Sequence, residues 1–273
     1  MSSPPPDVAA AFGAEPSRLR RLTGGQERTW YDGDVVLKPA DNPVEHSWVC
    51  DVFSVWDGSC GVQVPEPLSA PNGSWVYAGW AAHRFIAGRD ATMHQDSGLI
   101  RTASEVFHDE VRPLRAPAFL DTRTDAWSAG DRVAWEGAEP TGDAQTVDQI
   151  DRLRAAFRPV RATAQIIHGD IGGNVLATGV GPAVIDWPPY YRPVGFALAV
   201  AASDAVRWEG LPVAFLDEWV DVPEWYELVA RALVFRLATA GIRELAGLVT
   251  ASPQERAAAT EPVIAHVLER LGR

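Results

Sequence analysis

Short apolar runs separated by turn residues fill the first third of the chain. The run 35–37 follows an Asp-Gly dipeptide, a strong hairpin signal. Runs at 62–68 and 75–77 flank an Asn-Gly turn, which predicts that these two strands pair with each other. Between the two pairs, apolar residues at helical spacing predict one helix at 44–55. An antiparallel sheet carrying one helix is the simplest assembly of these parts.

The remainder of the chain is mostly helical in pattern. Apolar stripes predict helices at 99–114 and 147–157, and the segment 195–208 is apolar on nearly every face, which predicts a buried helix. A strand-rich segment at 165–187 interrupts these helices. The residues read as helix start signals are Thr146 with Gln149, Asp221 with Glu224, and Ser252 with Glu255.

These patterns predict an α+β chain of two lobes. The smaller lobe, residues 1–86, carries the antiparallel sheet, and the larger lobe, residues 87–273, is mainly helical. A cleft between two such lobes is a natural place for a ligand.

Composition narrows the class of protein. The 273 residues carry a formal net charge of −12, which argues against nucleic-acid binding. Cys50 and Cys60 lack metal-type spacing with histidine and read as reduced thiols. No basic segment followed by an apolar core opens the chain, and the apolar stretch 194–206 is too short to span a bilayer. We therefore expect a cytoplasmic protein without a membrane partner; its oligomeric state is left open.

Two segments carry the chemistry. Residues 166–176 read Ile-Ile-His-Gly-Asp-Ile-Gly-Gly-Asn-Val-Leu, and residues 183–187 read Ala-Val-Ile-Asp-Trp. Each begins as an apolar strand and ends in polar groups, so Asp170, Asn174 and Asp186 are expected at strand ends. Phosphoryl transfer needs this set: one carboxylate orients the attacking hydroxyl and accepts its proton, while an amide oxygen and a second carboxylate hold Mg²⁺.

The two segments resemble the catalytic and metal-binding loops of the aminoglycoside phosphotransferases, relatives of choline kinases and protein kinases. The resemblance implies a protein-kinase-like fold with ATP and Mg²⁺ in the cleft between the lobes. It assigns Asp170 as the catalytic residue and Asn174 and Asp186 as metal ligands. His168 would hydrogen-bond the loop.

The N-terminal segment supplies the nucleotide-binding residues that the resemblance implies. Gly24 and Gly25 would let the backbone approach the phosphates closely. Lys38 would bind phosphate, with Glu45 as its acidic partner in the short helix. Other acidic residues near Glu45, at positions 41 and 51, keep that pairing open.

The hinge would hold the adenine. It spans residues 83–86, and His83 and Phe85 are its candidate residues. Adenine would lie against backbone groups of this segment.

Three features depart from the family. Asn174 follows Asp170 by four residues where the usual spacing is five. The segment 188–193 reads Pro-Pro-Tyr-Tyr-Arg-Pro in place of a Gly-rich stretch with Asp-Pro. The acidic residue usual at the start of the following helix is replaced among residues 196–198, and Asp204 is a candidate to compensate.

Two clusters are candidates for binding the acceptor. Tyr190, Tyr191 and Arg192 follow the metal-binding Asp, and either line the cleft floor or cover the helical core. Asp121, Asp125 and Trp127 lie in a segment rich in charge and tryptophan, which fits either a sugar or cation site or a solvated connecting loop.

The function that follows is ATP-dependent phosphorylation of a hydroxyl on a small molecule such as an aminoglycoside, amino sugar, sugar or related alcohol. The alternative is a non-catalytic nucleotide-binding or scaffold protein with a degenerate kinase fold, which the shortened loop favours. The joint presence of Lys38, Asp170, Asn174 and Asp186 opposes it.

Overall fold

The computed structural model describes residues 3–22, 28–248 and 251–272. Contacts divide the chain into two compact units. The N-terminal unit comprises Met1–Asp90 with Leu176–Ile185, and the C-terminal unit comprises Ala91–Val175 with Asp186–Arg273. Within the described ranges, no helix has both the length and the apolar character needed to cross a membrane.

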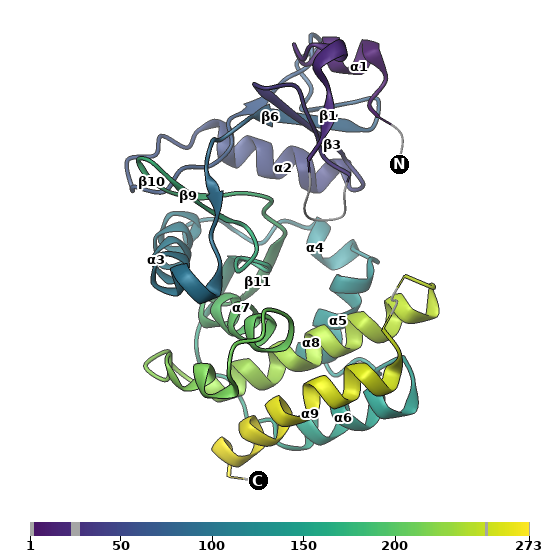
Figure 1. Ribbon diagram of the computed structural model, residues 1–273, viewed down its shortest axis with the longest axis vertical. Helices are drawn as coiled ribbons and strands as arrows, with labels where there is room; N and C mark the ends of the chain where they lie inside the picture. Colours follow the sequence, from purple (N-terminus) through teal and green to yellow (C-terminus); the bar gives the residue numbers. More distant parts are fainter. Residues whose placement is uncertain (1–2, 23–27, 249–250, 273) are drawn as a thin grey trace. The chain divides into compact units, whose positions relative to one another are not determined.

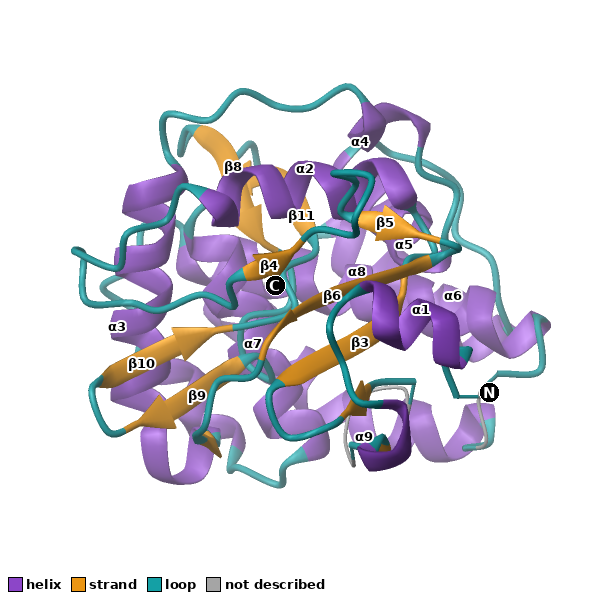
Figure 2. Cartoon of the chain, turned by 90° about the horizontal axis from the view of Figure 1, so that it is seen from above, coloured by secondary structure: helices purple, strands orange, loops and turns teal. Residues whose placement is uncertain are grey.

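The N-terminal unit is built on a small antiparallel sheet. The strand order is β1-β2-β3-β6-β4, with β5 also paired to β6, and β3 and β6 run side by side at its centre (Figure 2). Its elements are α1 (Pro6–Ala11), the 3₁₀ turn η1 (Pro16–Arg18), β1 (Arg20–Arg21), β2 (Trp30–Tyr31), β3 (Val35–Pro39), α2 (Pro43–Ser54), β4 (Pro67–Leu68), β5 (Val76–Tyr77) and β6 (Trp80–Arg84).

The first predicted hairpin is confirmed. β2 and β3 pair antiparallel, with Trp30 opposite Leu37, and Gly33 in the turn has a φ of +122° that favours glycine. The predicted helix at 44–55 is confirmed as α2, which begins after Asn42, whose side chain accepts a hydrogen bond from the Glu45 amide.

The second predicted strand pair is wrong. β4 and β5 do not pair with each other, because each pairs with β6. Ala78 and Gly79 have φ values of 48° and 79°, so they form a tight two-residue turn that sends β5 directly back along β6. An Ala-Gly pair is a weak signal for such a turn, and β6 was therefore missed in the sequence.

A compact apolar cluster holds this sheet to α1. Val8 of α1 and Phe12, which directly follows α1, pack with Val35 and Leu37 of β3 and with Ala82 of β6. All five are buried, so the first helix stabilises the strand that carries Lys38.

A second sheet belongs almost entirely to the N-terminal unit. Its order is β10-β9-β7, formed by β7 (Arg89–Asp90), β9 (Val175–Thr178) and β10 (Gly181–Val184). Residues 176–185, which include nearly all of the β9–β10 hairpin, belong to the N-terminal unit, and Gln63 bridges Ala183 there.

The C-terminal unit is helical around one long central helix, α8. In Figure 1, α8 lies alongside α5 and α9, and α5, α6, α7 and α9 all contact it. The elements of this unit are α3 (Met93–Val111), α4 (Phe119–Thr122), α5 (Ala126–Trp135), α6 (Ala144–Ala155), β8 (Ala164–His168), β11 (Pro189–Pro193), α7 (Gly195–Trp208), the 3₁₀ turn η2 (Val213–Asp217), α8 (Trp225–Leu245) and α9 (Pro253–Arg270).

The helix predictions are confirmed in type, but two caps differ. The fully apolar helix is α7, with the predicted bounds, and Ser252 with Glu255 forms a capping box at α9. Asp143, rather than Thr146, caps α6, because its carboxylate accepts the two backbone amides there. At α8, the Glu224 carboxylate accepts amides of the 161–162 segment instead of capping its own helix.

Candidate active site

The two motif segments meet at one end of a two-stranded ladder. β8 and β11 pair antiparallel, with His168 opposite Pro189. The amide of Gly169 donates to the carbonyl of Pro188, at 2.9 Å, which continues the ladder by one bond. Because β8 ends where β11 begins, Asp170, which follows β8, and Asp186, which precedes β11, lie at the same end of the ladder. Asn174 directly precedes β9, and Asp186 follows β10 by two residues, so both flank the same hairpin.

Asp170 is held at its backbone and its side chain. Its amide donates to Nδ1 of His168 at 3.1 Å, and its carbonyl accepts Nδ2 of Asn174 at 2.7 Å. Its carboxylate oxygen Oδ1 accepts a hydrogen bond from the guanidinium of Arg236 at 2.5 Å. The Asp170 side chain is still 48% exposed, so a ligand can reach it.

Two buried histidines, His108 and His168, hold the loop that carries Asp170. Nε2 of His108, from α3, accepts the His168 amide at 2.9 Å, and its Nδ1 lies 3.1 Å from the Ser104 hydroxyl. Burial lowers the pKa of His108 to about 3, so this ring is neutral and acts as an acceptor. The expected role of His168, hydrogen-bonding the loop, is confirmed by its acceptance of the Asp170 amide.

The shortened Asp170–Asn174 spacing is accommodated by a tight turn. The Asn174 amide donates to the carbonyl of Ile171 at 3.1 Å, which closes the turn over Gly172 and Gly173. A Cβ on Gly172 would lie 2.9 Å from Cβ and 3.1 Å from Cα of Ala201, in α7. The turn therefore packs directly against α7, and only a glycine at this point permits the approach.

The two loop glycines make a matched pair of variants. Gly172→Ala should push the loop off α7 and lower the free energy of unfolding by about 1–3 kcal/mol, the range for overpacking a close contact. Gly173→Ala meets no atom within 4 Å and should change it little. Urea unfolding of both variants measures the difference, and equal stability in the two would show that α7 does not limit the loop.

Asp186 occupies an unusual backbone conformation. Its φ is +49°, in the left-handed region that few non-glycine residues adopt, and its side chain is exposed. Trp187 next to it donates from Nε1 to the carbonyl of Ile167 at 3.0 Å and fixes the chain direction. Non-glycine residues held in this region concentrate at functional sites.

The donor set around the loop suits a hard cation. Asn174 uses its amide nitrogen for the Asp170 carbonyl, so its amide oxygen points away from that bond. Asp186 adds carboxylate oxygens from the other flank of the β9–β10 hairpin. Amide and carboxylate oxygens are the ligands that Mg²⁺ prefers, so the residues present fit this ion.

Arg236 on α8 is an active-site residue that the sequence analysis missed. Its side chain is 7% exposed, and it donates from Nε and from a terminal nitrogen to Asp204 of α7, at 2.9 and 2.5 Å. Burial works against its charge, but Asp204 and Asp170 hold the pKa of Arg236 above its usual value. Burial raises the pKa of Asp204 despite Arg236. The available signal was an arginine inside the apolar run 232–240 of α8, since such a side chain requires a buried counter-ion.

The predicted nucleotide-binding residues lie in the N-terminal unit. Lys38 is in β3 opposite Ala81, and Glu45 is in the first turn of α2. His83 is in β6, and Phe85 follows it with its ring 4.4 Å from that of Tyr31. The predicted glycine loop, Gly24 and Gly25, lies outside the described residues.

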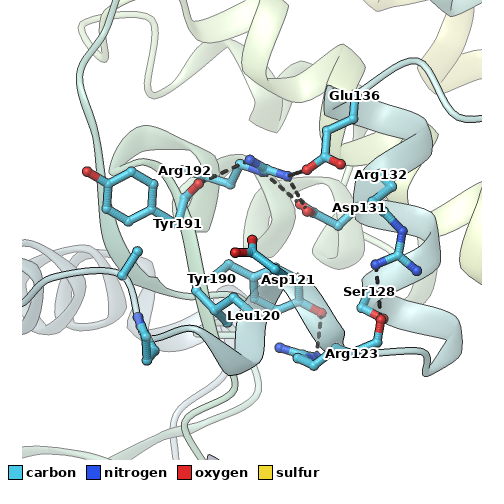
Figure 3. A pocket seen from close by; sticks show the side chains of 12 residues that line it. Leu120, Asp121, Arg123, Ser128, Asp131, Arg132, Glu136, Tyr190, Tyr191 and Arg192 are labelled. Carbon is cyan, nitrogen blue, oxygen red and sulfur yellow. Dashed lines mark hydrogen bonds and ion pairs between the residues drawn. The ribbon is translucent and has the colours of Figure 1, made fainter.

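A cavity of about 410 Å³ lies in the C-terminal unit beside β11. Figure 3 shows its side chains, which come from α4, α5, β11 and the residues that flank the two helices. It brings together four of the predicted acceptor residues, Asp121, Tyr190, Tyr191 and Arg192. Its acidic lining residues are Asp121, Asp131 and Glu136, and its basic ones are Arg123, Arg132 and Arg192.

Two other predicted acceptor residues have local roles. Asp125 caps α5, where its carboxylate accepts the amides of Trp127 and Ser128. The Trp127 ring lies 4.7 Å from the guanidinium carbon of Arg243. Neither residue lines the cavity, and the segment read as a possible connecting loop is helical from 126 to 135.

Tyr190 connects the cavity to the catalytic loop. A Cβ on Gly169 would lie 2.2 Å from the Tyr190 ring, so the ring packs directly against the backbone next to Asp170. Arg123 donates to the Tyr190 hydroxyl at 3.2 Å and to the Pro189 carbonyl at 3.0 Å. The cavity wall is thus rigidly joined to the loop that carries Asp170.

Arg192 forms an ion-paired wall of the cavity. Its guanidinium donates to both oxygens of Asp131, at 3.1 and 2.5 Å, and to Glu136 at 2.8 Å (Figure 3). Burial opposes its charge, but the hydrogen bonds to Asp131 hold the pKa of Arg192 above its usual value, while burial raises the pKa of Asp131. Two carboxylates therefore balance this arginine.

Arg192→Met should destabilise the fold in a pH-dependent way. Near pH 7 it leaves Asp131 buried without its cation, which costs about 3–5 kcal/mol of unfolding free energy. Because the folded state then binds a proton at Asp131 more readily than the unfolded state does, stability falls as pH rises, and the deficit relative to the wild type shrinks toward pH 4.

Urea unfolding of Arg192→Met and the wild type across this pH range gives the measurement. Glu136→Gln removes only the exposed partner and serves as the control with a small effect. A deficit that is the same at both ends of the pH range would show that Asp131 is not the group left unpaired.

The comparisons with known proteins establish the fold. Neither a protein-family model nor a curated protein sequence matches this chain. Among solved structures, it is similar to choline kinase LicA from Streptococcus pneumoniae, with a TM-score of 0.59, 9% identity and coverage of 92% of this chain and 93% of that one. An AMP-bound spectinomycin phosphotransferase gives 0.58, with 13% identity and 96% coverage of each chain.

A third similar structure is a choline/ethanolamine kinase family protein from Mesorhizobium loti, with a TM-score of 0.56, 17% identity and coverage of 97% and 93%. At these identities the likeness shows the fold alone. The fold is the protein-kinase-like fold shared by aminoglycoside phosphotransferases and choline kinases, so the prediction from the two sequence motifs is confirmed at this level.

Proposed function

We propose that the protein is an ATP-dependent phosphotransferase that acts on a hydroxyl of a small molecule. The observation that carries this proposal is the fixing of Asp170 at its amide, carbonyl and Oδ1 while its side chain stays accessible. Asn174 and Asp186 flank the adjoining hairpin. A preorganised carboxylate beside oxygen ligands suits phosphoryl transfer, where positioning and charge stabilisation supply most of the catalysis.

The reaction forms one bond and breaks one. The acceptor oxygen bonds to the γ-phosphorus of ATP as the bond from that phosphorus to the β,γ-bridging oxygen breaks, which leaves ADP. The acceptor's proton passes to the Asp170 carboxylate, which first orients the hydroxyl as a hydrogen-bond acceptor. Arg236 occupies Oδ1, so Oδ2 of Asp170 is the oxygen that takes this role.

Asn174 and Asp186 would hold Mg²⁺, which when bound neutralises charge on the phosphates. The hydrogen bond from Asn174 Nδ2 to the Asp170 carbonyl would turn the amide oxygen toward the ion. The left-handed backbone at Asp186 would aim the carboxylate to the same side, at a conformational cost that the surrounding structure carries.

The nucleotide would be bound with help from the N-terminal unit. Lys38 is the proposed phosphate ligand, Glu45 its proposed acidic partner, and His83 and Phe85 the proposed adenine contacts. One solved structure with this fold is described as an AMP-bound complex, which supports an adenine nucleotide as the donor.

The cavity beside β11 is the proposed acceptor site. Tyr190 forms part of its wall and packs on Gly169, so a hydroxyl bound there has a short route to Asp170. Its lining carries three acidic and three basic residues, and Arg192 is balanced by two carboxylates. This balance favours a neutral, hydroxyl-rich acceptor over a polycation or a polyanion.

A phosphotransfer screen tests the proposal. The full chain is incubated with ATP and Mg²⁺ and with sugars, amino sugars, aminoglycosides or choline-like alcohols, and phosphorylated product is detected by mass spectrometry. Product that depends on both Mg²⁺ and an acceptor supports the proposal. Nucleotide binding without turnover on any acceptor would instead favour a non-catalytic nucleotide-binding protein.

A further inference from the structure

Asp170 shares a buried arginine with a second carboxylate. Arg236 donates to Asp170 through one terminal nitrogen, and it donates to Asp204 through that same nitrogen and Nε. Asp204 is 15% exposed and Asp170 is 48% exposed, so one carboxylate of the pair is buried and the other faces solvent. The guanidinium carbon also lies 5.0 Å from the Phe235 ring and 5.6 Å from the Trp208 ring.

Contacts other than the one with Asp170 already fix the orientation of the Arg236 guanidinium. Nε and the terminal nitrogen both donate to Oδ2 of Asp204, at 2.9 and 2.5 Å, and Nε also donates to Oδ1 at 3.2 Å. Because two donors of the rigid guanidinium are held by one buried carboxylate, its orientation is restricted. The guanidinium carbon lies over the Phe235 ring, and this packing restricts the side chain further. The nitrogen that reaches Asp170 therefore has little freedom, and it places Oδ1 at one point.

If the Arg236–Asp204 ion pair had only a structural role, it would not need the additional hydrogen bond to Asp170. To hold α7 and α8 together, Arg236 needs only Asp204, which neutralises it. The additional bond goes to the exposed carboxylate of the catalytic loop, where it fixes one oxygen. Among the described residues, Oδ2 of Asp170 accepts no hydrogen bond, so the other oxygen is left for a ligand.

We propose that Arg236, with Asp204 behind it, is a positioning residue that fixes the Asp170 carboxylate and presents Oδ2 to the acceptor hydroxyl. This inference rests on the proposed function. Because the transition state of phosphoryl transfer is loose, the acceptor needs an oriented carboxylate more than a strong base, and an ion-paired carboxylate meets that need. α8 thereby takes part in the reaction from outside the two sequence motifs.

The test removes the arginine together with its buried counter-ion. Arg236→Met combined with Asp204→Asn avoids leaving a lone buried charge. We expect kcat to fall by about 10- to 100-fold, the scale for misplacing a reacting group by about 1 Å, while the KM for ATP stays within about twofold. Arg236→Lys retains the charge without the fork and should give an intermediate kcat.

The same helix offers a matched control. Arg231 on α8 is partly buried, with 11% of its side chain exposed, and pairs with Glu227 at 3.1 Å. Its other hydrogen bonds go to the carbonyls of Ala134 and Arg158, away from Asp170. Arg231→Met with Glu227→Gln should lower the melting temperature comparably and leave kcat per folded molecule within about threefold. Equal losses of kcat in both double variants, or a wild-type kcat in Arg236→Lys, would overturn the positioning role.

A stability cycle separates this inference from the proposed function, because it needs no turnover. Asp170→Ala, which removes the oxygen that accepts the Arg236 hydrogen bond, is measured by melting temperature in the wild type and in the Arg236→Met, Asp204→Asn background. If Arg236 holds Asp170, the two effects differ by several degrees. Equal effects overturn the inference even in an active enzyme. If the effects are coupled but the protein shows no phosphotransferase activity, the missing activity refutes the proposed function while the contact between Arg236 and Asp170 stands.

Discussion

Asp170→Asn should lower kcat by at least about a hundredfold, the scale of losing a general base. Asparagine keeps an oxygen for Arg236 and leaves both backbone hydrogen bonds of residue 170 in place, so the loop should stay folded. What is lost is the carboxylate oxygen that orients the acceptor hydroxyl and takes its proton. ATP should still bind, because the proposed nucleotide and metal ligands are untouched.

Steady-state kinetics with the best acceptor, together with calorimetry of ATP binding, measures the two effects separately. Asp109→Asn is a suitable control, since Asp109 is an exposed aspartate of α3 paired only locally with Arg112. A kcat within about threefold of wild type in Asp170→Asn would remove Asp170 from the reaction and, with it, the mechanism.

The positions of the motif residues could be predicted from the sequence, because the residues next to them in the chain determine which strand each one follows. Two apolar strands followed by polar groups placed Asp170 and Asp186 at strand ends. The β8–β11 ladder brings the end of β8, which Asp170 follows, to the start of β11, which Asp186 precedes. The buried helix α7 was also readable, because its apolar residues leave it no solvated face. These features depend on short-range patterns.

The contacts that fix Asp170 depend on distant parts of the chain. Arg236 lies 66 residues from Asp170, and His108 lies 60 residues from His168. An arginine within the apolar run 232–240 of α8 is visible in the sequence as an oddity, but its partners, like those of the buried His108, are set by how α3, α7 and α8 pack. β6 was missed for a different reason, since the Ala-Gly turn before it carries little signal.

Substitution of Asp186 should also have a large effect. The backbone conformation of Asp186 determines which substitution tests its carboxylate cleanly. Its φ of +49° means that alanine would combine the loss of charge with added backbone strain. Asparagine tolerates the left-handed region, so Asp186→Asn isolates the loss of the carboxylate's charge. Asp186→Ala then shows the sum of both effects.

In the wild type, Mg²⁺ should tighten ATP binding, because an ion held by Asn174 and Asp186 neutralises phosphate charge. In Asp186→Asn that tightening should fall by at least about tenfold, since even outer-shell partners of a metal site contribute this much. Asn174→Ala should weaken it less, because a neutral ligand is lost. Calorimetry with and without Mg²⁺ gives the measurement, and ATP affinity in the wild type that is indifferent to Mg²⁺ would show that the shortened loop holds no functional ion.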